Sequence, residues 1–97
     1  MPTYIHLISW TDQVIRNIKD APQRIDAFKK AVEAAGGKLT GFYVTMGKYD
    51  IVTIIDAPSD EALANITLNT GSKGSVRTET MKAFTEDQFR NILPKVQ

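Results

Sequence analysis

Hydrophobic and polar residues follow two periods along the chain, one typical of strands and one typical of helices. Residues 4–10 form a run of β-branched and aromatic side chains, which predicts a first strand. Residues 11–19 predict a short helical connector, which is interrupted before Pro22. A helix follows with Asp20 as its expected N-cap, because apolar side chains recur at helical spacing at Ile25, Phe28, Val32 and Ala35, and it ends at Gly36-Gly37.

Two further strand-like runs, residues 39–46 and 50–56, lie on either side of Gly47-Lys48-Tyr49. Such a short connection predicts that the two strands form an antiparallel hairpin. Residues 58–61 carry acidic side chains at the start of a second helix, where the helix dipole favours negative charge. Gly71 is expected to end this helix.

The last part of the chain predicts a strand and then a helix. Residues 76–84 form a strand more polar than the third, which indicates the edge of a sheet. Thr85 and Gln88 have the spacing of a capping box, so a short C-terminal helix is expected, ending at Pro94. The order β-α-β-β-α-β with one added helix predicts an α+β ferredoxin-like fold with an antiparallel sheet.

In this order the first and third strands are central, and the third strand is apolar on both faces. Ile51 and Ile55 point to one face, whereas Val52 and Ile54 point to the other. Two main helices cover only one face, so the second face needs another cover. We expect a second copy, packed sheet against sheet as a dimeric α/β barrel, because twofold dimers are the commonest assemblies. The alternative cover is the C-terminal helix of the same chain.

Composition restricts the class of protein further. A length of 97 residues predicts one domain spanning residues 1–97. A net charge of +1 without charged blocks predicts no nucleic-acid partner. The absence of cysteine excludes disulfides and thiolate catalysis, and one histidine with scattered carboxylates predicts no metal site and no cofactor. Without a secretory signal or a long apolar run, a cytoplasmic protein without membrane association is expected.

Four segments carry a family resemblance that covers nearly the whole chain. They are Trp10-Thr11-Asp12-Gln13, Gly47-Lys48-Tyr49-Asp50-Ile51-Val52, Val76-Arg77-Thr78-Glu79-Thr80 and Ala83-Phe84-Thr85. Together they resemble the GYD domain family, which implies a bacterial or archaeal dimeric α/β-barrel protein whose family name describes a motif and not an activity. The Gly-x-Tyr-Asp turn is also similar to the effector-binding domains of feast/famine transcription regulators, where small molecules bind between subunits. This sequence has no counterpart of their DNA-binding domain.

His6, Tyr49 and Asp50 are candidate ligand-binding residues with structural alternatives. His6 shares a strand face with Trp10 and can act as a general acid or base, or it can be a hydrogen-bonded interior residue. Tyr49 and Asp50 can face a pocket. They can instead build a turn in which Gly47 supplies a positive φ and Asp50 binds backbone amides.

Three further side chains are candidates for contact with a ligand. Trp10 and Tyr43 can stack on a flat molecule, although buried aromatic residues more often fill a core or an interface. Arg77 lies two residues from Glu79 on the same strand face, so it can pair with Glu79 or orient an acidic ligand.

Three functions remain open after these observations. The first is a small-molecule-binding or regulatory module with a pocket between the sheets of a homodimer or a larger homo-oligomer, near His6, Trp10 and Tyr49. The second is a cofactor-independent enzyme of the monooxygenase or isomerase kind, in which His6 or Asp50 moves a proton. The third is a structural or partner-binding subunit that needs only the dimer and an exposed edge strand.

Overall fold

The computed structural model describes residues 1–72, 74 and 76–96. In this part of the chain, one antiparallel sheet has the strand order β2-β3-β1-β4. Its strands are β1 (Thr3–Trp10), β2 (Lys38–Val44), β3 (Ile51–Asp56) and β4 (Val76–Ala83). The first and third strands are central and the other two are edges, so the predicted ferredoxin-like α+β fold is confirmed.

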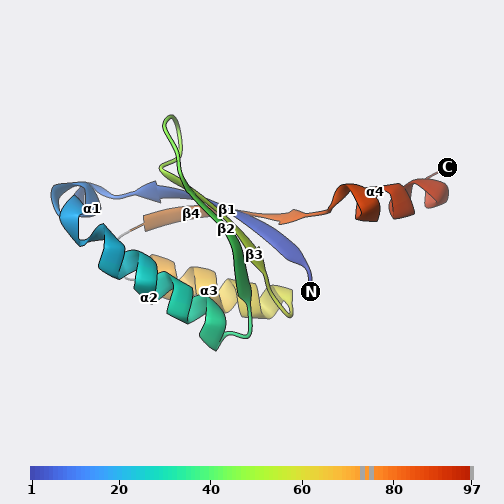
Figure 1. The fold of residues 1–97 in the computed structure, drawn as a ribbon, viewed down its shortest axis with the longest axis horizontal. Helices are drawn as coiled ribbons and strands as arrows, with labels where there is room; N and C mark the ends of the chain where they lie inside the picture. The colour runs from blue at the N-terminus through green and yellow to red at the C-terminus, as the bar shows by residue number, and fades with distance from the viewer. Residues whose placement is uncertain (73, 75, 97) are drawn as a thin grey trace.

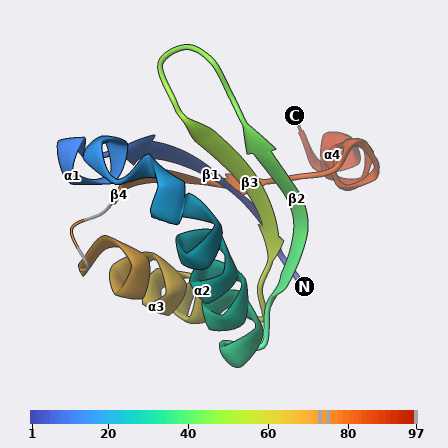
Figure 2. The same ribbon diagram turned by 60° about the vertical axis from the view of Figure 1, so that its left-hand side comes forward.

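The helices lie in a separate layer and at the two ends of the sheet. The short helix α1 (Asp12–Arg16) and the 3₁₀ turn η1 (Ile18–Asp20) follow β1. The short helix α4 (Glu86–Ile92) and a last 3₁₀ turn, η2 (Leu93–Lys95), follow β4. The two long helices are α2 (Ala21–Ala34) and α3 (Asp60–Ser72), and Figure 2 shows both on one side of the sheet. Among the described residues, no helix has the length and apolar character needed to cross a membrane.

The element boundaries differ from the prediction at three places. Asp20 makes no side-chain cap on α2, because it ends η1 with a backbone (φ −85°, ψ 0°) that already approaches the helical region. Helix α3 continues past Gly71 to Ser72, and the hairpin strands end at Val44 and begin at Ile51, so their connection is longer than expected. The capping box at Thr85 is confirmed, since its hydroxyl accepts from the Gln88 amide while the Gln88 side chain accepts from the Thr85 amide.

The hydrophobic core lies at the end of the sheet where β1 begins and β3 ends. Its buried residues come from the sheet and both long helices: Tyr4, Val32, Ile55, Ala57, Leu63 and Ile66. Tyr4 lies opposite Ile55 in the sheet register, and Phe28 and Leu39 pack against the cluster from α2 and β2. Burial of each large apolar side chain contributes about 1.5–3 kcal/mol, so this cluster joins the two layers.

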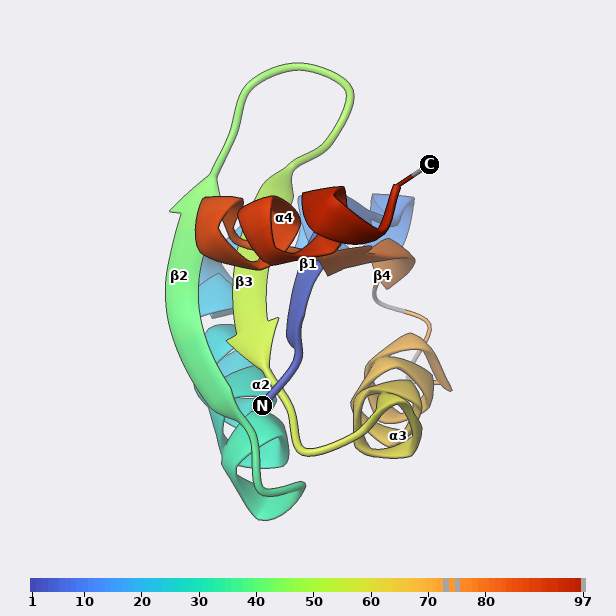
Figure 3. The same cartoon turned by 90° about the vertical axis from the view of Figure 1, so that its right-hand side faces the viewer.

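The opposite face of the sheet, which we call the open face, lies away from α2 and α3. It carries apolar side chains from all four strands: Ile5, Leu7, Tyr43, Val52, Ile54 and Met81. Tyr43 and Met81 are 60% and 46% exposed. Figure 1 shows that α4 projects away from the strands along the long axis of the molecule, and Figure 3, which looks along this axis, shows α4 in front of the strands. Helix α4 therefore does not pack against the open face.

Candidate functional site

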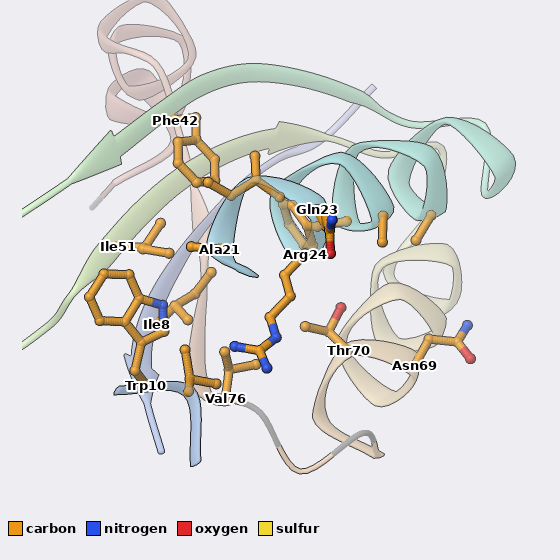
Figure 4. A pocket seen from close by; sticks show the side chains of 15 residues that line it. Ile8, Trp10, Ala21, Gln23, Arg24, Phe42, Ile51, Asn69, Thr70 and Val76 are labelled. Atoms are coloured by element: carbon orange, nitrogen blue, oxygen red, sulfur yellow. The ribbon is translucent and has the colours of Figure 1, made fainter. Parts of the chain in front are cut away.

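A cavity of about 300 Å³ lies between the sheet and the helical layer, at the end opposite the core. Strands β1 and β3 contribute Ile8, Trp10 and Ile51 to its wall, and α2 and α3 line it from the other side (Figure 4). Its volume is at the lower limit of cavities that hold small organic ligands. The cavity is therefore suited to a small molecule that is mostly apolar.

Small side chains on α2 explain why this end of the layer remains open. Ala21, Ala27 and Ala31 of this helix line the cavity beside the larger Ile25 and Phe28, whereas Val32 of the same helix lies in the core. An alanine at a helix–sheet interface leaves volume that a leucine or phenylalanine would fill. The alanines of α2 thus determine where the space lies.

Arg24 is the charged residue among the described residues that line the cavity. Its side chain extends from the first turn of α2 into the space between the strands and α3 (Figure 4). Its Nη1 is buried and has no hydrogen-bond partner in the described part of the chain. A buried donor without a partner is uncommon in native proteins, and one that carries charge is more costly still.

Polar side chains from both helices lie at the margin of the same cavity. Gln23 precedes Arg24 on α2, and Asn69 and Thr70 lie in the last turn of α3. The Thr70 hydroxyl donates to the Ile66 carbonyl at 2.8 Å, which leaves its oxygen able to accept a further hydrogen bond. These groups can bind a second polar atom of a ligand.

His6 lies in the buried layer between the sheet and the helices and does not line the cavity. Its Nε2 is 3.0 Å from the Thr67 hydroxyl, which itself donates to the Leu63 carbonyl. We therefore assign the ring proton to Nε2, which leaves Nδ1 buried and without a partner among the described residues. Burial lowers the pKa of His6, because the interior disfavours the charged imidazolium.

Asp50 binds the end of strand β1. Its carboxylate Oδ2 accepts a hydrogen bond of 2.8 Å from the Trp10 amide, and its own amide donates to the Ile8 carbonyl at 2.9 Å. Gly47 in the same loop has a φ of +123°, a conformation that favours glycine. Asp50 does not line the cavity, but it positions two residues that do, Ile8 and Trp10.

Tyr49, Tyr43 and Arg77 also lie outside the cavity. The Tyr49 hydroxyl donates to Glu79 Oε2 on β4 at 2.8 Å, and this hydrogen bond to a carboxylate raises the pKa of Tyr49. Arg77 and Glu79 share the open face, as their spacing predicts, and the described residues include no ion pair between them. Tyr43 is exposed on the same face, so these candidates lie on the opposite side of the sheet from Arg24.

A polar cluster at the other end of the sheet was not predicted from the sequence. The Tyr4 hydroxyl donates to Asp60, which also forms an ion pair of 3.4 Å with Lys82. The bond to Asp60 raises the pKa of Tyr4 to about 12, while Tyr4 and Lys82 lower the pKa of Asp60. The cluster links β1, the start of α3 and β4. We assign it a structural role.

Arg24 was also missed at the sequence level, although a signal for it exists. It lies four residues before Phe28 and eight before Val32, so it occupies the apolar stripe of α2. A charged residue in such a stripe must either reach solvent or meet a buried partner.

The described residues include no group of three or more histidine, aspartate or glutamate side chains placed to hold a metal ion.

Comparisons with solved structures define the class of fold. The feast or famine regulatory protein from M. tuberculosis, solved with L-methionine, superposes with a TM-score of 0.65 at 18% identity over 88% of this chain and 51% of that protein. The chain thus spans about half the length of that regulator. A crystal structure of a protein from Thermus thermophilus has a TM-score of 0.57 at 25% identity, covering 88% of this chain and 95% of the other. The fold is the ferredoxin-like domain that these proteins share.

The sequence comparisons identify the family. Residues 4–93 match the GYD domain. A Thermus thermophilus protein named "glutamine synthetase and cystathionine beta-lyase binding protein" is 32% identical over 85 residues, which cover 87% of this chain and 90% of that protein. The chain belongs to the GYD domain family.

Proposed function

We propose that this chain is a small regulatory binding module that takes a small apolar molecule into the cavity beneath α2. The observation that carries the proposal is the cavity itself, about 300 Å³ with a mostly apolar wall and a single charged lining residue among those described. Such a cavity with few, convergent polar groups is the usual form of a ligand site. The likeness to a regulator solved with a small molecule supports the same function.

The arrangement of titratable groups favours binding over proton transfer. The enzyme hypothesis requires His6 or Asp50 to reach a substrate, and neither lines the cavity. His6 is fully buried against Thr67, and the Asp50 carboxylate already accepts from the Trp10 amide. Binding needs only the shape of the cavity and its polar groups, both of which are formed.

We further propose that the module is a homodimer in which the open faces of two copies pack together. The centre of the open face is apolar, and α4 with the following turn η2 projects from the chain with Phe89, Ile92 and Leu93 42–53% exposed. In a twofold pair, the exposed apolar side chains of α4 in each copy can pack against the uncovered apolar face of the other copy.

The cytoplasmic location expected from the sequence stays a prediction.

A second candidate function is that the dimer binds a metabolic enzyme. The Thermus thermophilus relative is named for binding glutamine synthetase and cystathionine beta-lyase, and it matches nearly the full length of both chains. Co-elution of this protein with each purified enzyme in size-exclusion chromatography tests the candidate. Elution of all components at their separate positions contradicts it.

The cavity proposal is tested by filling the cavity. Thermal-shift screening of small apolar compounds should find ligands that stabilise the wild type by about 2.7 kcal/mol at a hundredfold excess over Kd. Ala31→Phe places a ring in the cavity and should remove this shift, whereas Ala34→Phe, at an exposed position of α2, should keep it. Ala27→Phe provides a second filling variant if Ala31→Phe does not fold. Equal shifts in the filled and control variants would place the ligand elsewhere and overturn the proposal.

A further inference from the structure

We infer that the ligand of the cavity is a small apolar carboxylate without a neighbouring ammonium group, and that the Arg24 guanidinium binds its carboxylate. The inference rests on the proposed function, because it assumes that the cavity binds a small molecule. It adds the chemical class of that molecule and the residue that recognises it.

The first argument is the unpaired charge in the cavity wall. Arg24 extends into the cavity, and its Nη1 is buried without a hydrogen-bond partner among residues 1–72, 74 and 76–96 (Figure 4). A guanidinium keeps its proton in proteins, so burial cannot neutralise it as it neutralises a histidine. An anion that enters the cavity would supply both the missing acceptor and the opposite charge.

The second argument is the absence of an internal partner. No aspartate or glutamate is found among the described residues that line the cavity. Among the described residues, ion pairs join Lys82 to Asp60 and Arg90 to Glu86, and neither pair involves Arg24. No described residue of the chain therefore supplies the anion, and a ligand can supply it.

The wall of the cavity distinguishes between classes of anion. A phosphate group carries more charge and more acceptor oxygens than one guanidinium can satisfy, and the remaining wall is mostly apolar. A carboxylate matches the fork of one guanidinium in a bidentate pair. A zwitterionic amino acid would leave its ammonium group without an acidic partner, so a simple carboxylic acid fits better.

The apolar part of the ligand is indicated by the aromatic side chains in the wall. Trp10, Phe28 and Phe42 line the cavity together with Ile8 and Ile51. Flat apolar groups pack well against aromatic faces and edges. The volume of about 300 Å³ limits the ligand to a single ring or a branched chain of similar size.

Three matched probes test the inference. We would compare 3-phenylpropanoate, its neutral amide 3-phenylpropanamide, and phenylalanine, which adds only an α-ammonium group to the acid. Binding would be measured by calorimetry and by the fluorescence of Trp10, the sole tryptophan and a wall residue. We expect the acid to bind at least about tenfold more tightly than the amide or phenylalanine, since the charge-assisted pair forms only with the acid.

Variants of Arg24 separate charge from shape. Arg24→Met keeps an apolar chain of similar length and should weaken acid binding at least about tenfold while leaving amide binding unchanged. Arg24→Lys should restore part of the preference, because it retains charge but not the bidentate fork. Arg16→Met removes an exposed arginine outside the cavity and should leave the preference intact.

The outcomes separate this inference from the proposed function. If acid and amide bind equally, and both are lost in the filled variant Ala31→Phe, the cavity binds ligands but Arg24 does not select a carboxylate. Tighter binding of phenylalanine than of the acid would likewise overturn the inference and indicate an amino-acid site. If none of the probes binds and the wider screen also finds no ligand, the proposed function itself fails.

Discussion

The Asp50 carboxylate accepts a hydrogen bond of 2.8 Å from the backbone amide of Trp10, a residue 40 positions earlier in the chain. This bond joins the Gly-Lys-Tyr-Asp segment to the end of β1, where the Trp10 side chain enters the wall of the cavity. The aspartate of the family motif therefore positions the site without contacting the cavity. This relationship explains how a turn motif can matter for binding.

Removal of the Asp50 carboxylate should destabilise the protein and disturb the position of Trp10. Asp50→Ala leaves the Trp10 amide without its acceptor and should lower the free energy of unfolding by about 1–3 kcal/mol, measured in urea. The Trp10 emission maximum should shift in the folded state. Asp50→Asn retains a side-chain oxygen acceptor and should recover most of the stability. A fully stable Asp50→Ala protein would show that the bond has no structural role.

Stability should decrease in mild acid because of His6. Burial lowers its pKa in the folded state, so below the ordinary histidine value near 6.5 the unfolded chain binds a proton that the folded chain does not. The contribution of neutral His6 is thus complete above that value and is lost as the pH falls toward the folded pKa. Within this window the free energy of unfolding should fall by up to about 1.4 kcal/mol per pH unit.

The control for this pH dependence is His6→Gln, whose side chain does not titrate. Urea unfolding at pH values from 8 to about 5 should show a smaller slope for the variant than for the wild type. The variant can be less stable overall, because Thr67 loses its partner Nε2, but only the slope tests the prediction. Parallel curves for the two proteins would assign the acid sensitivity to other groups.

The Tyr49–Glu79 bond should affect titration more than stability. Tyr49 donates to the Glu79 carboxylate at a largely exposed site, and this bond raises the pKa of Tyr49. In Glu79→Gln the Tyr49 phenolate should therefore form at lower pH than in the wild type, as measured by ultraviolet absorbance. Tyr49→Phe identifies the titrating group by removing it. An unchanged titration in Glu79→Gln would show that the pair does not persist in solution.

Mass measurement by light scattering tests the proposed dimer. The wild type should have twice the monomer mass of 10.8 kDa, whereas Met81→Glu should shift the protein toward monomer because it places a charge on the open face. Leu68→Glu makes a similar change at a position of α3 that is 71% exposed, and this variant should remain dimeric. A wild type that is monomeric at every concentration tested would exclude the sheet-to-sheet dimer.

Features that depend on neighbouring residues were predictable from the sequence. The Thr85 capping box formed as expected, because its two hydrogen bonds connect residues only three apart. The polar fourth strand lies at an edge of the sheet and the third strand is central, because an edge strand is paired on one side only and is more exposed to solvent. Asp20, by contrast, did not cap α2, since the preceding 3₁₀ turn had already set its backbone.

The sequence by itself thus determined the order of the elements, the strand order and the family. The tertiary structure alone decided that Asp50 binds Trp10, that His6 is buried against Thr67, and that Arg24 enters a cavity beside Trp10. These contacts join residues far apart in the chain, and the space between α2 and the sheet depends on every side chain packed there. The alanines of α2 leave that space open, and Arg24 places one charged side chain within it, with its Nη1 buried.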